Sequence, residues 1–238
     1  MVTPEPAELV LYQDPAILVV NKPPGLLSLQ DGYDKTIPHL VTILAPEYGP
    51  LLIVHRLDRD TSGILIMART VEAHRSLNEQ FQRRNVEKVY HALVLGVPTW
   101  HEMSASFPLR KNGDRKHRTI IDFELGKKAW TDFIRLKKFP HHALVEAHPH
   151  TGYTHQIRAH LAHLGFPILA DPLYGESPLI SQASPMSTTL PLISPIQRMA
   201  LHACSITFTH PTQLERITFS APYPQDFVDA TIALDRLK

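Results

Sequence analysis

The sequence contains one cysteine, Cys204, among 238 residues, and a lone cysteine excludes a disulfide within the chain. It also lacks a run of about 20 apolar residues, the length that crosses a bilayer as a helix. The N-terminus carries acidic residues and proline where a secretory signal would carry basic ones. From these absences we expect a protein of the reducing cytoplasm, without a membrane partner.

Motifs of nucleotide and hydrolase chemistry are missing too. Neither GxGxxG nor GxxxxGK[ST] occurs, so no glycine-rich phosphate loop is indicated, and no GxSxG elbow suggests a serine hydrolase. His150, His155, His160 and His163 gather in one stretch, but they lack the HExxH spacing and no cysteine lies near them. Surface and helix-end histidines are the simpler interpretation, and we expect no metal.

The net charge of +1 conceals an asymmetry. Residues 83–138 contain thirteen lysines and arginines against six acidic residues, and the densest basic run is 110–118. Such one-sided charge favours a polyanionic partner, of which nucleic acid is the commonest in the cytosol. The alternative is a solvated charged loop without a partner.

Short apolar runs separated by turn residues predict many strands and few helices. We expect strands at 9–12, 17–20, 51–54, 64–67, 88–96, 126–136, 143–147, 199–209 and 217–220, and helices at 36–44, 70–85, 154–164 and 226–237. Thr70 and Thr154 are the expected N-caps of the second and third of these helices. No linker divides the chain, so we expect one domain over 1–238, with a short N-terminal extension at 1–8 and an irregular loop rich in serine and proline at 177–196.

The most informative stretch is His55–Gly63, a charged segment between two apolar runs, which predicts a tight loop between two buried strands. Its aspartate, Asp58, has two arginines within two positions, which favour the ionised carboxylate. A carboxylate on a loop at a sheet edge is suited to nucleophilic or base chemistry. The alternative is an Asp–Arg network that closes a hairpin. Lys22, at the end of an expected strand, is predicted either to touch a phosphate or simply to be exposed.

The chain resembles the RluA-type family of RNA pseudouridine synthases over nearly its full length. The resemblance is carried by ILVVNKPPGLLS (17–28), HRLDRDTSG (55–63), KVYHALVLG (88–96), GKKAWT (126–131), TGYTHQIRAHLAHLGFPILADPLYG (151–175), MALHACSITFTHP (199–211) and FSAP (219–222). The pair HRLDxxTSG and THQIRxH in this order is highly specific. One departure is Tyr153, where the family usually has a basic residue.

The resemblance implies an α+β fold, with a mixed, largely antiparallel central sheet flanked by helices and a central basic cleft. It implies isomerisation of uridine in RNA without cofactor or metal. By position, Asp58 matches the catalytic aspartate, Tyr90 the active-site tyrosine, Arg158 the arginine that pairs with the aspartate, and Arg56 the arginine that fills the gap left by the extracted uridine. Further RNA contacts are expected from Lys22, Arg110, Lys111, Arg115, Lys116, Arg118, Lys127, Lys128 and His155.

We expect a monomer that acts on a stem-loop of ribosomal or transfer RNA, because an unpaired nucleotide is cheaper to extract than a paired one. The segment before residue 17 is too short for the N-terminal RNA-binding module that many family members carry. Two other functions remain open. A non-catalytic RNA-binding protein would use the same scaffold, and a nucleoside or carbohydrate hydrolase would not need the basic middle of the chain.

Overall fold

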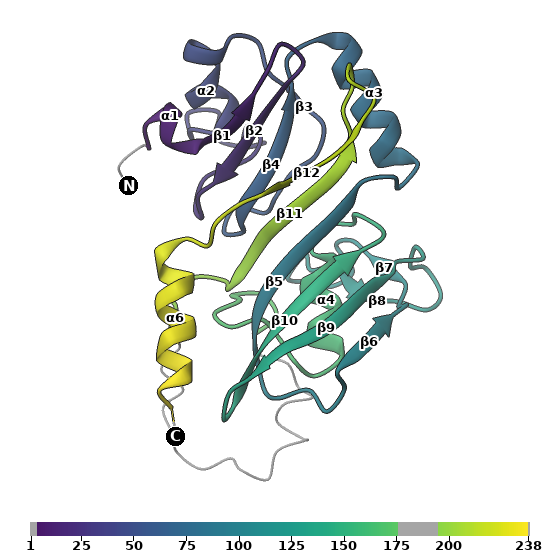
Figure 1. Ribbon diagram of the computed structural model, residues 1–238. Helices are drawn as coiled ribbons and strands as arrows, with labels where there is room; N and C mark the ends of the chain where they lie inside the picture. The colour runs from purple at the N-terminus through teal and green to yellow at the C-terminus, as the bar shows by residue number, and fades with distance from the viewer. Residues whose placement is uncertain (1–3, 176–194, 238) are drawn as a thin grey trace. The chain divides into compact units, whose positions relative to one another are not determined.

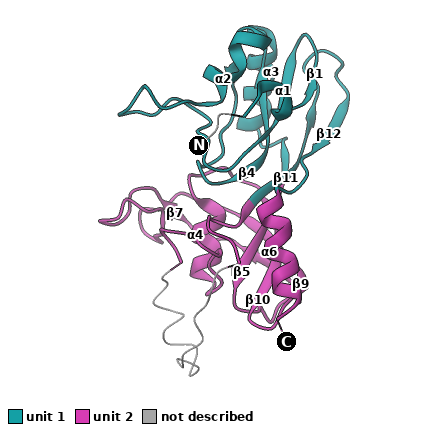
Figure 2. Cartoon of the chain, turned by 90° about the vertical axis from the view of Figure 1, so that its left-hand side faces the viewer, with its two compact units in different colours: residues 1–88, 202–224 teal, residues 89–201, 225–238 magenta. Residues whose placement is uncertain are grey.

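The structure is a computed structural model that describes residues 4–175 and 195–237. The chain divides into two compact units (Figure 2), of which unit 1 contains residues 1–88 and 202–224 and unit 2 contains residues 89–201 and 225–238. Each unit is therefore assembled from two separate segments of the sequence. The expected irregular loop at 177–196 lies, apart from its last two residues, outside the described residues.

Unit 1 is a mixed sheet with three helices. In chain order its elements are α1 (Pro6–Leu9), β1 (Val10–Gln13), β2 (Ile17–Lys22), α2 (Leu40–Tyr48), β3 (Leu52–Ile53), β4 (Ser62–Ala68), α3 (Val71–Gln82), β11 (Leu201–Thr209) and β12 (Arg216–Ser220) (Figure 1). The strand order is β1-β2-β4-β11, with β3 paired to β4 and β12 paired to β11. Only β4 and β11 run parallel to each other; the other pairs are antiparallel.

The core of unit 1 is built around two apolar runs of the sequence, one in β2 and one in β4, directly after the HRLDRDTSG motif. Ile17–Val20 in β2 and Ile64–Ala68 in β4 are almost wholly buried, as expected of central strands covered on both faces. Helix α3 begins where the sequence predicts, because the hydroxyl of Thr70 accepts a hydrogen bond from the N–H of Ala73. Its buried residues, Ala73 and Leu77, face the core.

Gly63, the last residue of the HRLDRDTSG motif, is required at its position in β4. Its φ is +112°, and a Cβ atom there would lie 2.2 Å from the carbonyl oxygen of Ala203 in β11. No side chain fits this approach, so glycine is what allows β4 and β11 to pair directly after the loop that carries Asp58.

The described residues of unit 2 form a second group of strands and two helices. Its elements are β5 (Glu87–Leu95), of which the first two residues belong to unit 1, β6 (Glu102–Ala105), β7 (Leu109–Arg110), β8 (Ile120–Ile121), β9 (Thr131–Lys138), β10 (His142–Pro149), α4 (Gln156–His163) and α6 (Gln225–Asp235). The strand order is β5-β10-β9-β6, all antiparallel, and β7 and β8 form a separate two-stranded sheet. Helix α4 packs against β8, β9 and β10.

The expected fold class, α+β with a mixed and largely antiparallel sheet flanked by helices, is confirmed. The helix predicted at 36–44 was wrong in its bounds, since α2 runs from Leu40 to Tyr48. It begins late because His39 and Thr42 form a capping box, in which the backbone N–H of His39 donates to the hydroxyl of Thr42. It continues through Pro46, and Gly49, with φ +79°, ends it. No helix among the described residues combines the length and apolarity of a bilayer-crossing segment.

Candidate active site

Asp58 lies in the loop between β3 and β4, and Ser28 fixes the backbone of this loop. The hydroxyl of Ser28 donates to the carbonyl of Leu57 at 2.9 Å and accepts from the N–H of Leu57 at 3.1 Å. The carbonyl of Asp58 accepts from the N–H of Thr61 at 3.1 Å and so closes the turn. The backbone on both sides of Asp58 is therefore held, while its side chain is half-buried and that of Arg56 is exposed.

Lys22 is a second support of the same loop, and the expectation that it would be exposed was wrong. Its side chain is fully buried, and its ammonium donates to the carbonyls of Pro23, Leu26 and Arg59 at 2.8–2.9 Å. Three carbonyl acceptors take up the hydrogen-bonding capacity of an ammonium group. Lys22 therefore joins its own loop to the Asp58 loop, and it does not offer its charge to an RNA phosphate.

His55, the first residue of the HRLDRDTSG motif, has a structural position. Its Nε2 atom accepts a hydrogen bond from the N–H of Ile66 at 3.0 Å, and its ring stacks on Phe81 with 4.8 Å between the ring centroids. Burial, with a smaller contribution from the charge of Lys88, lowers the pKa of His55 to about 3. The neutral imidazole therefore ties the start of the Asp58 loop to β4.

In unit 2, Arg158 projects from the first turn of α4 and forms a buried ion pair with Asp171. The Nε and Nη2 atoms of Arg158 donate to the two carboxylate oxygens of Asp171, each at 2.8 Å, and both side chains are at most 6% exposed. Asp171 also accepts the backbone N–H groups of Leu173 and Tyr174, so the carboxylate orders the turn that follows it. The sequence predicts a short strand and a turn at 166–175, but not the ion pair. The turn is present, whereas the strand is reduced to a single bridge between Ile168 and Val94. The available signal was an aspartate before proline in a segment that ends in glycine.

The start of α4 is fixed by Gln156 and not, as expected, by a Thr154 cap. The residue that precedes the helix is His155, which has a left-handed backbone and makes no side-chain cap. The amide oxygen of Gln156 accepts from the hydroxyl of Thr151 and the N–H of Tyr153. Its amide nitrogen donates to the carbonyl of Trp130 and the hydroxyl of Thr131, both at 2.9 Å. The first two bonds order the loop before α4, and the other two fasten the turn that carries Arg158 to the start of β9.

His160 extends the same chain of hydrogen bonds. Its Nε2 atom lies 3.0 Å from the carbonyl of Phe107, which can only accept, so Nε2 carries the proton. Its Nδ1 atom therefore accepts from the hydroxyl of Thr131 at 3.0 Å. Burial lowers the pKa of His160 to about 4. The neutral ring therefore joins α4 to Thr131, the first residue of β9.

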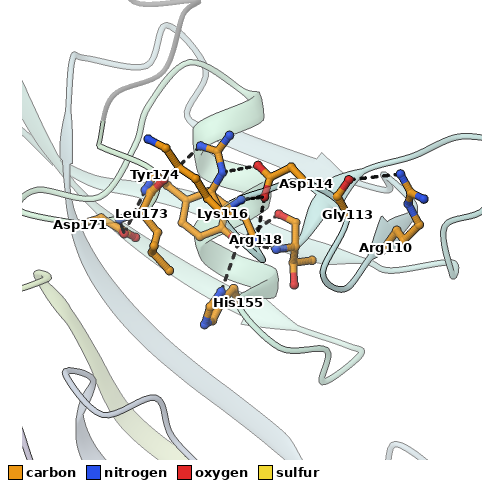
Figure 3. A network of polar contacts seen from close by, with 10 residues as sticks. Arg110, Gly113, Asp114, Lys116, Arg118, His155, Asp171, Leu173 and Tyr174 are labelled. Carbon is orange, nitrogen blue, oxygen red and sulfur yellow. Dashed lines mark hydrogen bonds and ion pairs between the residues drawn. The ribbon is translucent and has the colours of Figure 1, made fainter.

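The basic run between β7 and β8 is ordered by Asp114 and Asp122, of which Asp114 is shown in Figure 3. Asp114 accepts from the backbone and the guanidinium of Arg118, and these bonds lower the pKa of Asp114. Asp122 forms an ion pair with Arg110, in which its carboxylate lies 2.7 Å from Nε but without the alignment of a hydrogen bond. The same carboxylate accepts hydrogen bonds from two backbone N–H groups of the next turn. Arg110 and Arg118 thus each hold one part of this segment.

The other basic residues predicted to contact RNA differ in their exposure to solvent. Five of them are exposed and make no ion pair within the described residues, namely Lys111, Arg115, Lys116, Lys127 and Lys128. The remaining one, His155, is half-buried, and its Nδ1 atom lies 3.3 Å from the hydroxyl of Tyr174. The segment therefore combines paired arginines, which give it shape, with cations that face solvent.

Tyr90 lies in β5 opposite Ala147 of β10 and is half-buried. The role of Tyr90 at the reacting base stays a prediction. So do the pairing of Asp58 with Arg158 and the central basic cleft, because Asp58 belongs to unit 1 and Arg158 to unit 2. The described residues contain no group of three or more histidine, cysteine, aspartate or glutamate side chains that could hold a metal ion.

A family model described as RNA pseudouridylate synthase matches residues 16–163. Ribosomal large subunit pseudouridine synthase D of Pseudomonas aeruginosa is 35% identical over 231 residues, which cover 92% of this chain and 69% of that protein. Ribosomal large subunit pseudouridine synthase C of Buchnera aphidicola is 38% identical over 228 residues, which cover 94% and 69%. The solved structure of human RNA pseudouridylate synthase domain containing 1 has a similar fold, with a TM-score of 0.73 and 28% identity over 94% of this chain and 87% of that one.

Replacing Lys22 by methionine tests its structural role. We expect Lys22→Met to lower the free energy of unfolding by about 3 kcal/mol, because three buried carbonyls lose their donor. Urea unfolding measures this loss, and Lys35→Met, at an exposed lysine of the same unit, should change it by less than about 0.5 kcal/mol. A variant of unchanged stability that binds RNA more weakly would show that Lys22 is a phosphate contact after all.

The neutral state of His160 makes the stability depend on pH. Its pKa is about 4 in the fold and 6.5 when unperturbed, so below pH 6.5 the unfolded chain binds more protons than the folded one. The free energy of unfolding should therefore fall by up to about 3 kcal/mol between pH 6.5 and pH 4, on account of this residue. Urea unfolding across that range should show a shallower decline in His160→Gln than in the exposed control His117→Gln. Equal slopes in the two variants would contradict the assignment.

Proposed function

The chain belongs to the RNA pseudouridylate synthase family, and from this premise we propose that its substrate is ribosomal RNA of the large subunit. It is an RNA pseudouridine synthase, an isomerase that converts a uridine of RNA into pseudouridine. The proposed substrate is supported by the relatives at 35% and 38% identity, whose names both specify the large ribosomal subunit. The observation that supports the chemistry is Asp58, carried on a loop whose backbone is bound on both sides.

The reaction breaks the bond between C1′ of the ribose and N1 of the uracil and makes a bond between C1′ and C5. The hydrogen leaves C5, and N1 ends protonated, so the atoms balance without a cofactor. Because the detached uracil must rotate before C5 can face C1′, the nucleotide has to leave its stack. Extraction costs a few kcal/mol, and the cost is smallest for a nucleotide that is already unpaired.

We assign the first step to the carboxylate of Asp58. Two routes satisfy the chemistry. In one, the carboxylate attacks C1′ and displaces the uracil; in the other, it removes a proton from the sugar and generates a glycal. Both require an ionised carboxylate held in a fixed direction. The hydrogen bonds that Ser28 makes to Leu57 supply the fixed direction.

Arg158 is proposed to keep that carboxylate ionised and aligned. One edge of its guanidinium, Nε and Nη2, is bound to Asp171, which fixes the plane of the group. A guanidinium has five N–H donors, so a second carboxylate can be bound by the same group, and we assign Asp58 to it. Tyr90 is assigned to the uracil ring and the C5 proton, and Arg56 to the gap that the extracted nucleotide leaves.

RNA binding is assigned chiefly to the five exposed cations of residues 110–128, with a further contact from His155. Contacts of this type bind phosphates, which hold the RNA without reading its sequence. Arg110 and Arg118 are bound by carboxylates of the protein, so we assign to them the shape of the segment.

The catalytic proposal is tested with RNA tritiated at C5 of uridine, because isomerisation releases the label. Asp58→Asn keeps the size of the side chain and removes its charge, so we expect turnover to fall by about 1,000-fold or more while RNA binding is retained. Asp60→Asn, in the same loop, is the matched control and should keep its turnover. Release from a large-subunit transcript and not from transfer RNA would support the proposed substrate; the reverse would overturn it, and turnover in Asp58→Asn would remove Asp58 from its role.

The electrostatic proposal is tested by replacing Lys111, Arg115 and Lys116 together with glutamine. If each contacts one phosphate, the slope of log K against log salt concentration should become shallower by about 2 to 3. The matched control replaces Lys35, Arg84 and Lys138, three exposed cations elsewhere in the sequence, and should leave the slope unchanged. An unchanged slope in the first variant would show that this segment does not contact RNA.

A further inference from the structure

Tyr174 is a buried tyrosine that the proposed mechanism does not use, although it touches both parts of the machinery in unit 2. It is 5% exposed and lies in the turn that begins at Asp171. Its side chain has two chemically different ends, a hydroxyl and a ring face. Each end contacts a different functional element.

The hydroxyl holds the end of the basic segment. It accepts from the backbone N–H of Thr119 and donates to the carbonyl of Thr119, both at 2.9 Å. Thr119 is 2% exposed and follows Arg118, where the basic loop returns into β8. Since both backbone groups of one residue are bound, the phenol fixes the point from which the loop extends (Figure 3).

The ring supports Arg158. The guanidinium carbon of Arg158 lies 5.0 Å from the centroid of the Tyr174 ring, within the range of a cation–π contact. Asp171, three residues earlier in the same turn, binds the Nε and Nη2 edge of that guanidinium. One short turn therefore restrains Arg158 both in its plane and across its face.

Arg118, in the basic loop, contacts both the Tyr174 ring and the backbone of the turn that carries it. Its Nη1 atom donates to the carbonyl of Leu173 at 3.1 Å, and its guanidinium carbon lies 5.8 Å from the Tyr174 ring. Its Nε atom is bound to Asp114 within the loop. The basic loop and the turn at Asp171 are thus joined at the hydroxyl, at the ring and at the backbone.

We propose that Tyr174 is a positioning residue that fixes the RNA-contacting loop through its hydroxyl and Arg158 through its ring. The inference rests on the proposed function, in which the loop contributes to RNA binding and Arg158 to the chemical step. It predicts that the two ends of one side chain affect different kinetic constants. Loss of the hydroxyl releases the loop, whereas loss of the ring releases the guanidinium.

The hydroxyl is tested with Tyr174→Phe, which keeps the ring. We expect KM for the RNA to rise about fivefold to tenfold, since hydrogen bonds to both backbone groups of Thr119 are lost, and kcat to stay within about twofold. The amide hydrogen of Thr119 should also exchange faster with solvent. The matched control is Tyr153→Phe, because Tyr153 packs against the same cluster as Tyr174 and its hydroxyl makes no hydrogen bond within the described residues.

The ring is tested with Tyr174→Leu, and with Tyr174→Met in case the first variant does not fold. Both should lower kcat about tenfold or more in addition to raising KM, because the guanidinium loses its support. Urea unfolding identifies variants that are folded under the assay conditions. These measurements are made on the full chain with the tritium-release assay.

The outcomes separate this inference from the proposed function. If the unmodified protein releases no tritium, the proposed function fails. If it is active and Tyr174→Phe has the kinetic constants and Thr119 exchange rate of Tyr153→Phe, the positioning role is overturned. It is also overturned if the phenylalanine variant loses kcat to the same extent as the folded leucine or methionine variant, since the ring and the hydroxyl would then not act separately.

Discussion

A buried guanidinium needs a fixed counter-charge, and the ion pair between Arg158 and Asp171 is the interaction on which the rest of unit 2 depends. Both side chains are almost fully buried, and an unpaired charge at such a position would cost several kcal/mol. The two hydrogen bonds of the pair, together with the two backbone N–H groups that Asp171 accepts, leave this carboxylate well satisfied. The direction of Arg158 is consequently set by the backbone of a short turn, and that same turn carries Tyr174.

In unit 1, the loop that carries Asp58 is also held in place, but by hydrogen bonds to its backbone. There the proposed catalytic side chain is the carboxylate of Asp58, and two supporting residues bind the backbone of its loop. Lys22 donates to three carbonyls and Ser28 binds both backbone groups of Leu57. These bonds use backbone groups of the loop and not the side chain of Asp58, so they fix the path of the chain on both sides of this residue. Supporting groups of this kind are what a loop needs if it is to hold a catalytic group with the precision of a strand.

Much of the fold was predictable because it depends on local patterns. The strand pairs follow from apolar runs and turn residues, and α3 follows from its spacing and from the Thr70 cap. Lys22 was misjudged because lysine is rarely buried, and the carbonyls that receive it include one 37 residues away in the sequence. The cap expected at Thr154 failed for a similar reason, since two of the four partners of Gln156 lie at the start of β9, about 25 residues earlier in the sequence. Pairings such as Arg158 with Asp171 depend on two segments that meet only in the folded chain, and spacing alone does not reveal them.

On the proposed function, a division among the cations of the basic segment bears on how RNA is chosen. Arg110 and Arg118 are bound to aspartates, a use that suits the planar guanidinium, whereas Arg115 and all four lysines of residues 110–128 are exposed to solvent. A lysine ammonium on a flexible stem binds a phosphate as a point charge and reads no base, so the proposed contacts of these lysines would add affinity and not sequence discrimination. On the proposed function, selection among uridines must then come from elsewhere. The cost of extracting the nucleotide differs between paired and unpaired sites by a few kcal/mol, which is enough to favour a loop over a stem wherever the phosphates fit equally well.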